Sequence, residues 1–510
     1  MRGFHNIWRL IRTGATLERA GAMNIVLDAF EATPPLRFVA RALGLPFKYL
    51  GYPGDPSMPP ATRALTALGP AYIKFGQILS TRPDVVGDEL AVQLRVLQDK
   101  LPPFSVEEAK AAVEKELGRP VDLMFSEFSA PVAAASIAQV HRAKLFETGE
   151  DVAVKVLRPG VERAFRKDVD AFYLAANMVE LFSPGARRLR PMDVIEHFDG
   201  VVRGELDLRL ESAAASEFAA NTAKDTGFTL PQIKWDYSAK RVMTLGWADG
   251  VPMGDNDALD AAGHDRVDLG NRVLQLFLSH ALRDGYFHAD MHQGNMKVAP
   301  NGDIIAYDFG IMGYIDEYTR RVYAEILYGF IRRDYKRVAK VHFEAGYVPA
   351  DKDVDEFARA LRAVGEPIFG MDASRISMAR LLAYLFEVTE RFGMETRTEL
   401  ILLQRTMVVV EGVARSLNPR INIWEVASPV VTSYIRQSIG PRAALTDLAN
   451  TVKVLARFGP RLPVLVEDAL MAQANPPQTD RRPRKRWYVA AGFAGAVLGA
   501  FVVILWDALV

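Results

Sequence analysis

The chain has 510 residues, with 62 Lys and Arg against 62 Asp and Glu, so its formal net charge is zero, and it has no cysteine. At about 150 residues per domain, this length predicts two to four structural units, and the 49% hydrophobic content predicts a large globular core. Disulfides and thiolate metal sites are excluded. The balanced charge gives no reason to expect a nucleic acid as a partner.

Residues 1–60 are expected to form an amphipathic leader followed by a proline-rich linker. Four arginines alternate in the first twenty residues with apolar side chains at positions 4, 7, 8 and 11, which is helical spacing. Such a basic amphipathic helix can lie on an anionic membrane surface or pack on the folded domain, and the sequence favours neither alternative. No uncharged run here is long enough for a signal peptide.

Residues 61–118 are expected to form a helical extension. Its first helical stretch ends at Pro102-Pro103, because proline cannot continue a helix. Ser105 with Glu108 three residues later is a capping box, which predicts a second helix that runs to Leu117.

Residues 119–250 are expected to form a lobe that begins with strands. Ile137–Leu145 and Val152–Leu157 flank a Thr148-Gly149 turn, which predicts a β-hairpin. Helical periodicity then returns from Val161 to Ala223.

Residues 251–470 are expected to form a second, mostly helical lobe. A helix is predicted over Asp265–Asp284, with Gly285 in a C-terminal stop position. Another hairpin is predicted between Met296 and Tyr307, around an Asn-Gly turn.

Residues 471–486 are expected to be a linker with a basic cluster, and residues 487–506 a transmembrane helix. This last run contains 20 residues without a charge, enough to cross about 30 Å of hydrocarbon. Because Arg481–Arg486 precede it, the positive-inside rule places the bulk of the protein, including its catalytic domain, on the cytoplasmic side. A buried core helix is the alternative, and the basic cluster disfavours it.

The candidate catalytic and metal-binding residues lie in and around the second hairpin. Asp290 is followed five residues later by Asn295 and, across the hairpin, by Asp308-Phe309-Gly310. This spacing is typical of kinase-like folds, in which one carboxylate orients the group that attacks the phosphate and two further residues bind magnesium. Asp290 is therefore a candidate catalytic residue, as is Lys155 further upstream, and Asn295 and Asp308 are the candidate metal ligands. An Asp-Phe-Gly triplet alone would be weak support.

Upstream, Val-Ala-Val-Lys ends in Lys155 on a predicted strand and matches the strand that carries the phosphate-binding lysine of kinases. Lys155 needs a carboxylate to hold it. Glu211 is the best candidate from its distance along the chain, but Glu205 and Glu217 lie nearby and spacing alone does not decide.

The segment before this strand is expected to line the nucleotide, yet it lacks the glycines that kinases use there. Methyl groups restrict φ and keep the backbone farther from a phosphate. By composition alone it would be interpreted as a packed turn of small residues. The candidate nucleotide-binding residues are Lys155, Glu211 and Val132, Ala133, Ala134, Ala135, Ser136, Ile137, Ala138, Gln139 and Val140.

Taken together, these motifs resemble the UbiB family of atypical kinase-like proteins. The resemblance covers about residues 68–430 and includes K-x-G-Q at Lys74–Gln77, the alanine-rich loop, E-x-D at Glu205–Asp207 and H-A-D-x-H-x-G-N at 288–295. Two positions depart from the family. Gln293 replaces a proline, which would loosen the catalytic loop, and Gly246 stands where relatives often have a glutamate at the nucleotide hinge.

The resemblance implies an α+β, two-lobed protein-kinase-like fold with an N-terminal helical extension and a C-terminal transmembrane helix. In relatives the K-x-G-Q helix occupies the place of a peptide substrate and the E-x-D residues face it. Lys74, Gln77, Glu205 and Asp207 would inherit this role, which disfavours protein substrates.

The resemblance also implies ATP and Mg²⁺ as cofactors, and a location in the bacterial inner membrane with a single C-terminal span. Expected partners are membrane lipid and polyprenyl quinone precursors, with other ubiquinone biosynthesis enzymes suggested by the family's role. The expected function is that of an atypical kinase or ATPase that supports ubiquinone biosynthesis. The alternatives are a nucleotide-gated scaffold that presents lipid intermediates with incidental hydrolysis, and a protein kinase.

Overall fold

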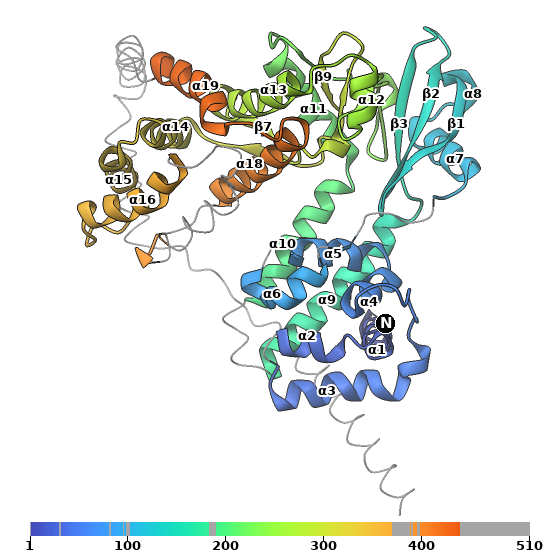
Figure 1. Ribbon diagram of the computed structural model, residues 1–510. Coiled ribbons are helices and arrows are strands. Elements are labelled where there is room, and N and C mark those ends of the chain that lie inside the picture. Colours follow the sequence, from blue (N-terminus) through green and yellow to red (C-terminus); the bar gives the residue numbers. More distant parts are fainter. Residues whose placement is uncertain are drawn as a thin grey trace, which may run out of the picture. The chain divides into compact units, whose positions relative to one another are not determined.

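Helices make up the N-terminal part of the chain in the computed structural model (Figure 1). The structure describes residues 2–29, 32–80, 83–94, 96–97, 103–182, 190–369, 388, 391–394 and 398–438. The first helices are α1 (Arg2–Ala20), α2 (Met23–Ala29), α3 (Pro34–Gly44), the 3-10 helix η1 (Leu45–Leu50), α4 (Pro60–Leu68), α5 (Pro70–Ser80) and α6 (Pro83–Leu94). The helical stretch predicted from residue 61 is confirmed over its described residues as α4, α5 and α6. It is divided, because Gly69 between α4 and α5 has a φ of 107° that ends a helix.

Helix α1 is the predicted amphipathic helix, and it packs on the domain. Arg9 forms an ion pair with Asp168 of α9 (Val161–Phe182). The hydroxyl of Thr13 lies 2.6 Å from that of Tyr72 in α5, and Ala15 is fully buried. Of the two alternatives for the leader, packing on the domain is therefore the one that the structure shows.

A four-stranded antiparallel sheet follows, in the order β1-β2-β3-β5. Its strands and the helices before them are α7 (Val106–Leu117), α8 (Val121–Met124), β1 (Phe125–Ala134), β2 (Ala138–Leu145), β3 (Asp151–Leu157) and β5 (Val242–Gly246). The predicted β2–β3 hairpin is confirmed, as is the capping box, in which Ser105 and Glu108 satisfy each other's backbone N–H groups at the start of α7. Strand β1 was not predicted.

The predicted helical segment after β3 is confirmed over its described residues as α9, α10 (Pro191–Glu205) and α11 (Leu208–Thr222). A second sheet has the order β4-β9-β8-β6, and β7 pairs with β10. These strands are β4 (Phe228–Thr229), β6 (Val251–Pro252), β7 (Tyr286–His288), β8 (Met296–Val298), β9 (Ile304–Ala306) and β10 (Met312–Tyr314). The predicted hairpin around Asn301-Gly302 is thus confirmed as β8–β9.

Helix α13 (Arg266–Ser279) lies in the core of the second lobe, where it packs against α18 (Thr398–Leu417) and α19 (Ile423–Ser438). The prediction over Asp265–Asp284 is confirmed, with Asp265 as the cap and a π-helical turn η4 (His280–Asp284) as the last part. The remaining elements are η3 (Trp235–Tyr237), α12 (Asn256–Ala261), η5 (Gln293–Asn295), α14 (Glu317–Ile331), α15 (Tyr335–Glu344) and α16 (Val354–Phe369).

The predicted basic linker and transmembrane helix, residues 471–506, lie outside the described residues. Within the part of the chain that the structure does describe, no helix combines the length and the apolar character that crossing a membrane requires.

Candidate active site

Strand β3 presents Lys155 to the site because side chains alternate between the two faces of a strand. Val154 and Val156 are fully buried on the face that packs against α7, so Lys155 projects from the other face. Its Nζ donates to both carboxylate oxygens of Glu211 in α11, at 2.6 and 2.9 Å. The structure therefore selects Glu211 as the partner of Lys155, which the sequence spacing could not do.

This ion pair lies in a largely desolvated place, with 20% of the Lys155 side chain and 11% of the Glu211 side chain exposed. Burial by itself lowers the pKa of Lys155, but the nearby carboxylates of Asp308 and Glu211 outweigh it and hold that pKa above its usual value. Burial raises the pKa of Glu211, and the attraction of Lys155 opposes the rise. Lys155 thus stays charged throughout the neutral range.

Asp308 follows β9, and its carboxylate faces the same ammonium group. The Asp308 Oδ1 atom lies 3.9 Å from Lys155 Nζ and accepts a hydrogen bond of 3.1 Å from the backbone N–H of Gly310. The charge of Lys155 holds the pKa of Asp308 below its usual value. Because 46% of this side chain is exposed, an ionised carboxylate is available to a ligand.

Asp290 and Asn295 come together in the loop between β7 and β8. The Nδ2 group of Asn295 donates to the backbone carbonyl of Asp290 at 3.1 Å and to its carboxylate Oδ2 at 3.3 Å. The amide nitrogen of Asn295 is thereby occupied, so its Oδ1 is the atom that can serve a cation. The carboxylate of Asp290 also lies 3.6 Å from Nε2 of His292 and is 42% exposed.

Three residues that were not predicted as site residues hold this loop in place. Buried His288 accepts a 3.0 Å hydrogen bond at Nδ1 from the Asp290 backbone N–H, and burial lowers its pKa, so the ring is neutral. Thr406 in α18 donates to the carbonyl of Ala289 at 3.1 Å, and Tyr307 donates to the carbonyl of Gly294. His288 belongs to the quoted motif, but nothing in the sequence singles out Thr406.

The candidate nucleotide-binding segment, residues 132–140, is mostly strand. The sequence predicted the strand that follows the turn, but not the strand that precedes it. The first three members of the segment end β1 and its last three begin β2, so only Ala135–Ile137 form the turn. The backbone N–H of Ala135 donates to the carbonyl of Ala138 at 2.8 Å. Gln139 is buried and hydrogen-bonded to both backbone groups of Phe104, at 3.0 and 3.2 Å. This side chain therefore fastens the segment before α7 to the sheet.

The K-x-G-Q helix α5 contacts the E-x-D segment through one ion pair. Lys74 Nζ lies 2.6 Å from Glu205 Oε1, and both side chains are more than four-fifths buried. The charge of Glu205 also raises the pKa of Lys155, which connects this pair electrostatically to the Lys155 site. Asp207 instead pairs with Arg209 at 2.6 Å.

Asp207 also caps α11. Gln77, the other predicted member of this group, donates to the carbonyl of Leu97 at 3.5 Å.

The hinge after β5 contains a cation-flanked tryptophan. The indole of Trp247 has the guanidinium of Arg142 at 4.9 Å and the ammonium of Lys297 at 5.1 Å from its ring centre. Lys297 also donates to the carbonyl of Ala248 at 2.8 Å. At neighbouring Gly246 a Cβ atom would meet only ordinary contacts, so a larger residue is not excluded there by the backbone around it.

Comparisons with known proteins agree with this geometry. Residues 96–342 match the ABC1 atypical kinase-like domain, and residues 361–422 match the UbiB helical domain. A protein of Marinobacter nauticus named "Probable protein kinase UbiB" is 39% identical over 457 residues, which cover 85% of this chain and 83% of the relative. The chain belongs to the UbiB family. A protein of the same name from Azotobacter vinelandii is 38% identical over 507 residues, 98% of this chain and 93% of the relative.

Among solved structures, the complex of Rv3197 with erythromycin from Mycobacterium tuberculosis superposes with a TM-score of 0.52 at 26% identity. It covers 70% of this chain and 90% of the other. The expected resemblance to UbiB and the α+β kinase-like fold are thereby confirmed, and a kinase-like domain implies nucleotide binding in general terms. The segment that matches the UbiB helical domain includes Thr406, whose hydroxyl connects α18 to the loop after β7.

Proposed function

We propose that this UbiB-family protein is a membrane-anchored atypical kinase or ATPase that binds Mg-ATP and supports ubiquinone biosynthesis by acting on or near polyprenyl quinone precursors. One observation carries the proposal. The Lys155–Glu211 ion pair lies beside the exposed carboxylate of Asp308, and Asp290 and Asn295 are hydrogen-bonded to each other in the loop before β8. This is the set of groups that phosphoryl transfer requires.

The donor atoms fit magnesium. Mg²⁺ prefers hard oxygen ligands and completes its shell with water and substrate phosphates. Asp308 has a depressed pKa and so offers an ionised carboxylate, and Asn295 offers Oδ1 because its Nδ2 is occupied by Asp290. When bound, the ion would neutralise phosphate charge. Lys155 would contact the phosphates, and Asp290 would orient the attacking group.

The contact between Lys74 and Glu205 supports a small-molecule acceptor, or hydrolysis alone, over a protein acceptor. If α5 lies where a kinase receives its peptide, as the resemblance implies, a peptide would have to break this buried ion pair of 2.6 Å. Losing one partner of a buried pair is costly because the other charge stays desolvated. We further propose that residues 487–506 anchor the protein in the bacterial inner membrane, with the kinase-like domain in the cytoplasm.

The proposal is tested with Asp308→Asn and Asp290→Asn in the full-length protein. Asp308→Asn should remove the magnesium-dependent thermal shift that ATP produces by mass action, whereas Asp290→Asn should keep that shift and abolish phosphate release. Asp351→Asn is a matched control, since its side chain is 73% exposed. An unchanged shift in Asp308→Asn would overturn the metal assignment. If Asp290→Asn still restores ubiquinone in cells that lack the gene, the nucleotide-gated scaffold is the better interpretation.

A further inference from the structure

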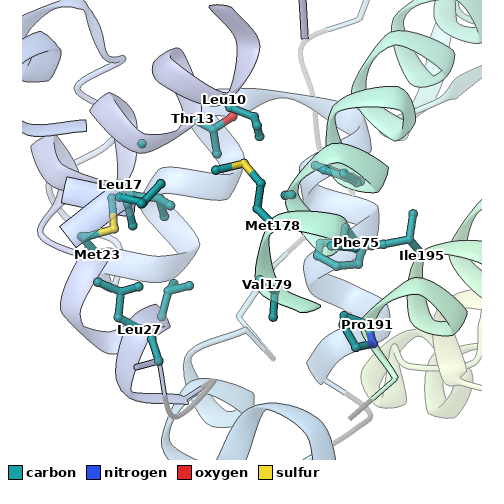
Figure 2. Close-up of a pocket in the computed structure, with 18 of the residues that line it drawn as sticks. Leu10, Thr13, Leu17, Met23, Leu27, Phe75, Met178, Val179, Pro191 and Ile195 are labelled. Atoms are coloured by element: carbon teal, nitrogen blue, oxygen red, sulfur yellow. The ribbon is translucent and has the colours of Figure 1, made fainter. Parts of the chain in front are cut away.

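An apolar cavity of about 280 Å³ lies among the N-terminal helices and α9 and α10, and none of the predicted site residues lines it. Figure 2 shows side chains that line it, contributed by α1, α2, α3, α5, α9 and α10. Leu17 of α1, Leu27 of α2 and Phe75 of α5 are among them, as are Met178 of α9 and Ile195 of α10. The cavity is thus lined by helices that are far apart in sequence, and it opens to the surface on one side.

The lining offers no charge to a ligand. Among its described residues Thr13 alone has a polar side chain. Its hydroxyl is already engaged, since it donates to the carbonyl of Arg9 at 2.9 Å and lies 2.6 Å from the hydroxyl of Tyr72. A ligand in this cavity would therefore contact only apolar surface. Any polar group of the ligand that entered the cavity would lose its hydrogen bonds to water without replacement.

The volume is large for a packing defect. An engineered apolar cavity of about 150 Å³ stays dry and takes up benzene, and this cavity is nearly twice as large. Small residues on facing helices create it, namely Gly14 on α1, Ala40 on α3 and Ala176 on α9. Because a ligand that binds only the folded state stabilises that state, a ligand that fills this cavity would stabilise the extension.

We infer that this cavity binds one uncharged hydrocarbon chain, the tail of a membrane lipid whose polar end stays outside. The linear acyl tail of a phospholipid and the branched tail of a prenyl lipid share this chemistry. Leu10, Val26 and Val39 are only partly buried, so the lining reaches the surface, where a chain can enter.

The cavity also shares helices with the candidate active site. Phe75 lines the cavity and is the neighbour of Lys74 in α5, and Ile195 lines it from α10, the helix that ends at Glu205. Phe75 packs against Phe198 of α10, with ring centres 5.2 Å apart. A chain in the cavity therefore contacts both helices whose side chains form the Lys74–Glu205 ion pair, so its binding orders the two sides of that pair together.

The test uses full-length protein in phospholipid nanodiscs and two photoreactive probes, diazirine derivatives of decanol and of geraniol. Labelled side chains are mapped by peptide mass spectrometry. We expect labels on lining residues of α1, α5, α9 and α10. Stronger labelling by the decanol probe would indicate an acyl tail, and stronger labelling by the geraniol probe a prenyl tail.

Ala176→Leu should lower this labelling about tenfold, because the larger side chain occupies the space of the ligand. Ala427→Leu is the matched control, since Ala427 lines a different cavity of about 130 Å³ in the second lobe. It should leave the labelling unchanged. Adding decanol or geraniol should also slow amide hydrogen exchange in α5 and α10 of the wild type but not of Ala176→Leu.

Labels confined to other surfaces, or labelling that Ala176→Leu does not reduce although the variant melts like the wild type, would overturn the inference. If Ala176→Leu fails to fold, Ala40→Leu, which fills the cavity from α3, replaces it. None of these measurements uses ATP, so their failure would leave the proposed nucleotide chemistry untouched, and failure of that chemistry would leave this site standing.

Discussion

Replacing Lys155 with methionine tests the central ion pair, because it removes the positive charge and keeps a side chain of similar length. Glu211 would then stay in a site where only 11% of its side chain is exposed. It would also face Asp308, whose charge already disfavours its ionised form. Lys155→Met should therefore destabilise the protein in addition to weakening nucleotide binding.

The size of the effect follows from the burial of the pair. Removing one partner of a buried ion pair typically costs about 3–5 kcal/mol. Lys155 is 20% exposed and Glu211 can take up a proton, so we expect the lower end, about 3 kcal/mol. Lys144→Met on the adjacent strand is the matched control. Its pair with Glu127 is 36% and 72% exposed, so its loss should cost at most about 1 kcal/mol.

The destabilisation should depend on pH in a defined direction. Burial raises the pKa of Glu211, and without Lys155 nothing of opposite charge at 2.6 Å opposes that rise. A group whose pKa is higher in the folded state than in the unfolded state loses its stabilising contribution as pH rises through the folded value. The stability deficit of Lys155→Met should therefore be larger at pH 8 than at pH 5.

Denaturant midpoints and melting temperatures of the three proteins at both pH values measure this. The double variant Lys155→Met with Glu211→Gln should recover most of the lost stability, because no buried charge remains, while nucleotide binding stays weak. A deficit no larger than that of Lys144→Met, or one that does not change with pH, would refute the reasoning from burial.

Three further predictions concern other parts of the chain. Burial lowers the pKa of His342 to about 4, whereas the histidine of an unfolded chain has a pKa of about 6.5. Between pH 6.5 and pH 4 the unfolded state therefore binds a proton that the folded state does not. The free energy of unfolding of the wild type should fall by up to about 3 kcal/mol over this range. His342→Leu should flatten that decline in a melting series, and a parallel decline would contradict this. Ala135→Gly should cost about 0.5–1 kcal/mol and tighten ATP binding, measured as dissociation constants. Equal affinities would mean that the turn is only structural. A chain that ends at Thr479 should fractionate without detergent, and a continued need for detergent would place the anchor elsewhere.

Local patterns predicted the parts of the fold that depend on neighbouring residues. The capping box before α7, the β2–β3 hairpin and the β8–β9 hairpin each rest on a few consecutive side chains. Strand β1 was not predicted because it contains Pro131 and its buried and exposed residues do not alternate regularly. Irregularities in its pairing with β2 interrupt that alternation. Its place is set by β2 and not by its own sequence.

The assignment of Glu211 and not Glu205 to Lys155 shows why the site was only partly predictable. The sequence suggested one helical segment over Val161–Ala223, and this segment would contain both Glu205 and Glu211. The chain instead breaks between α10 and α11 at Leu206-Asp207. The two carboxylates therefore lie on separate helices, and Glu205 reaches Lys74 while Glu211 reaches Lys155. Periodicity cannot reveal such a break, because both halves remain helical.

The cation-flanked Trp247 at the hinge gives the protein an intrinsic optical reporter. Arg142 lies on a strand of the first sheet and Lys297 on a strand of the second, and each approaches the same indole to about 5 Å. The emission wavelength of an indole shifts with the electric field across its ring. A rotation of one sheet relative to the other would move one cation and not the other. In a variant whose other five tryptophans are replaced, the emission wavelength of Trp247 would therefore follow lobe movement without any attached dye.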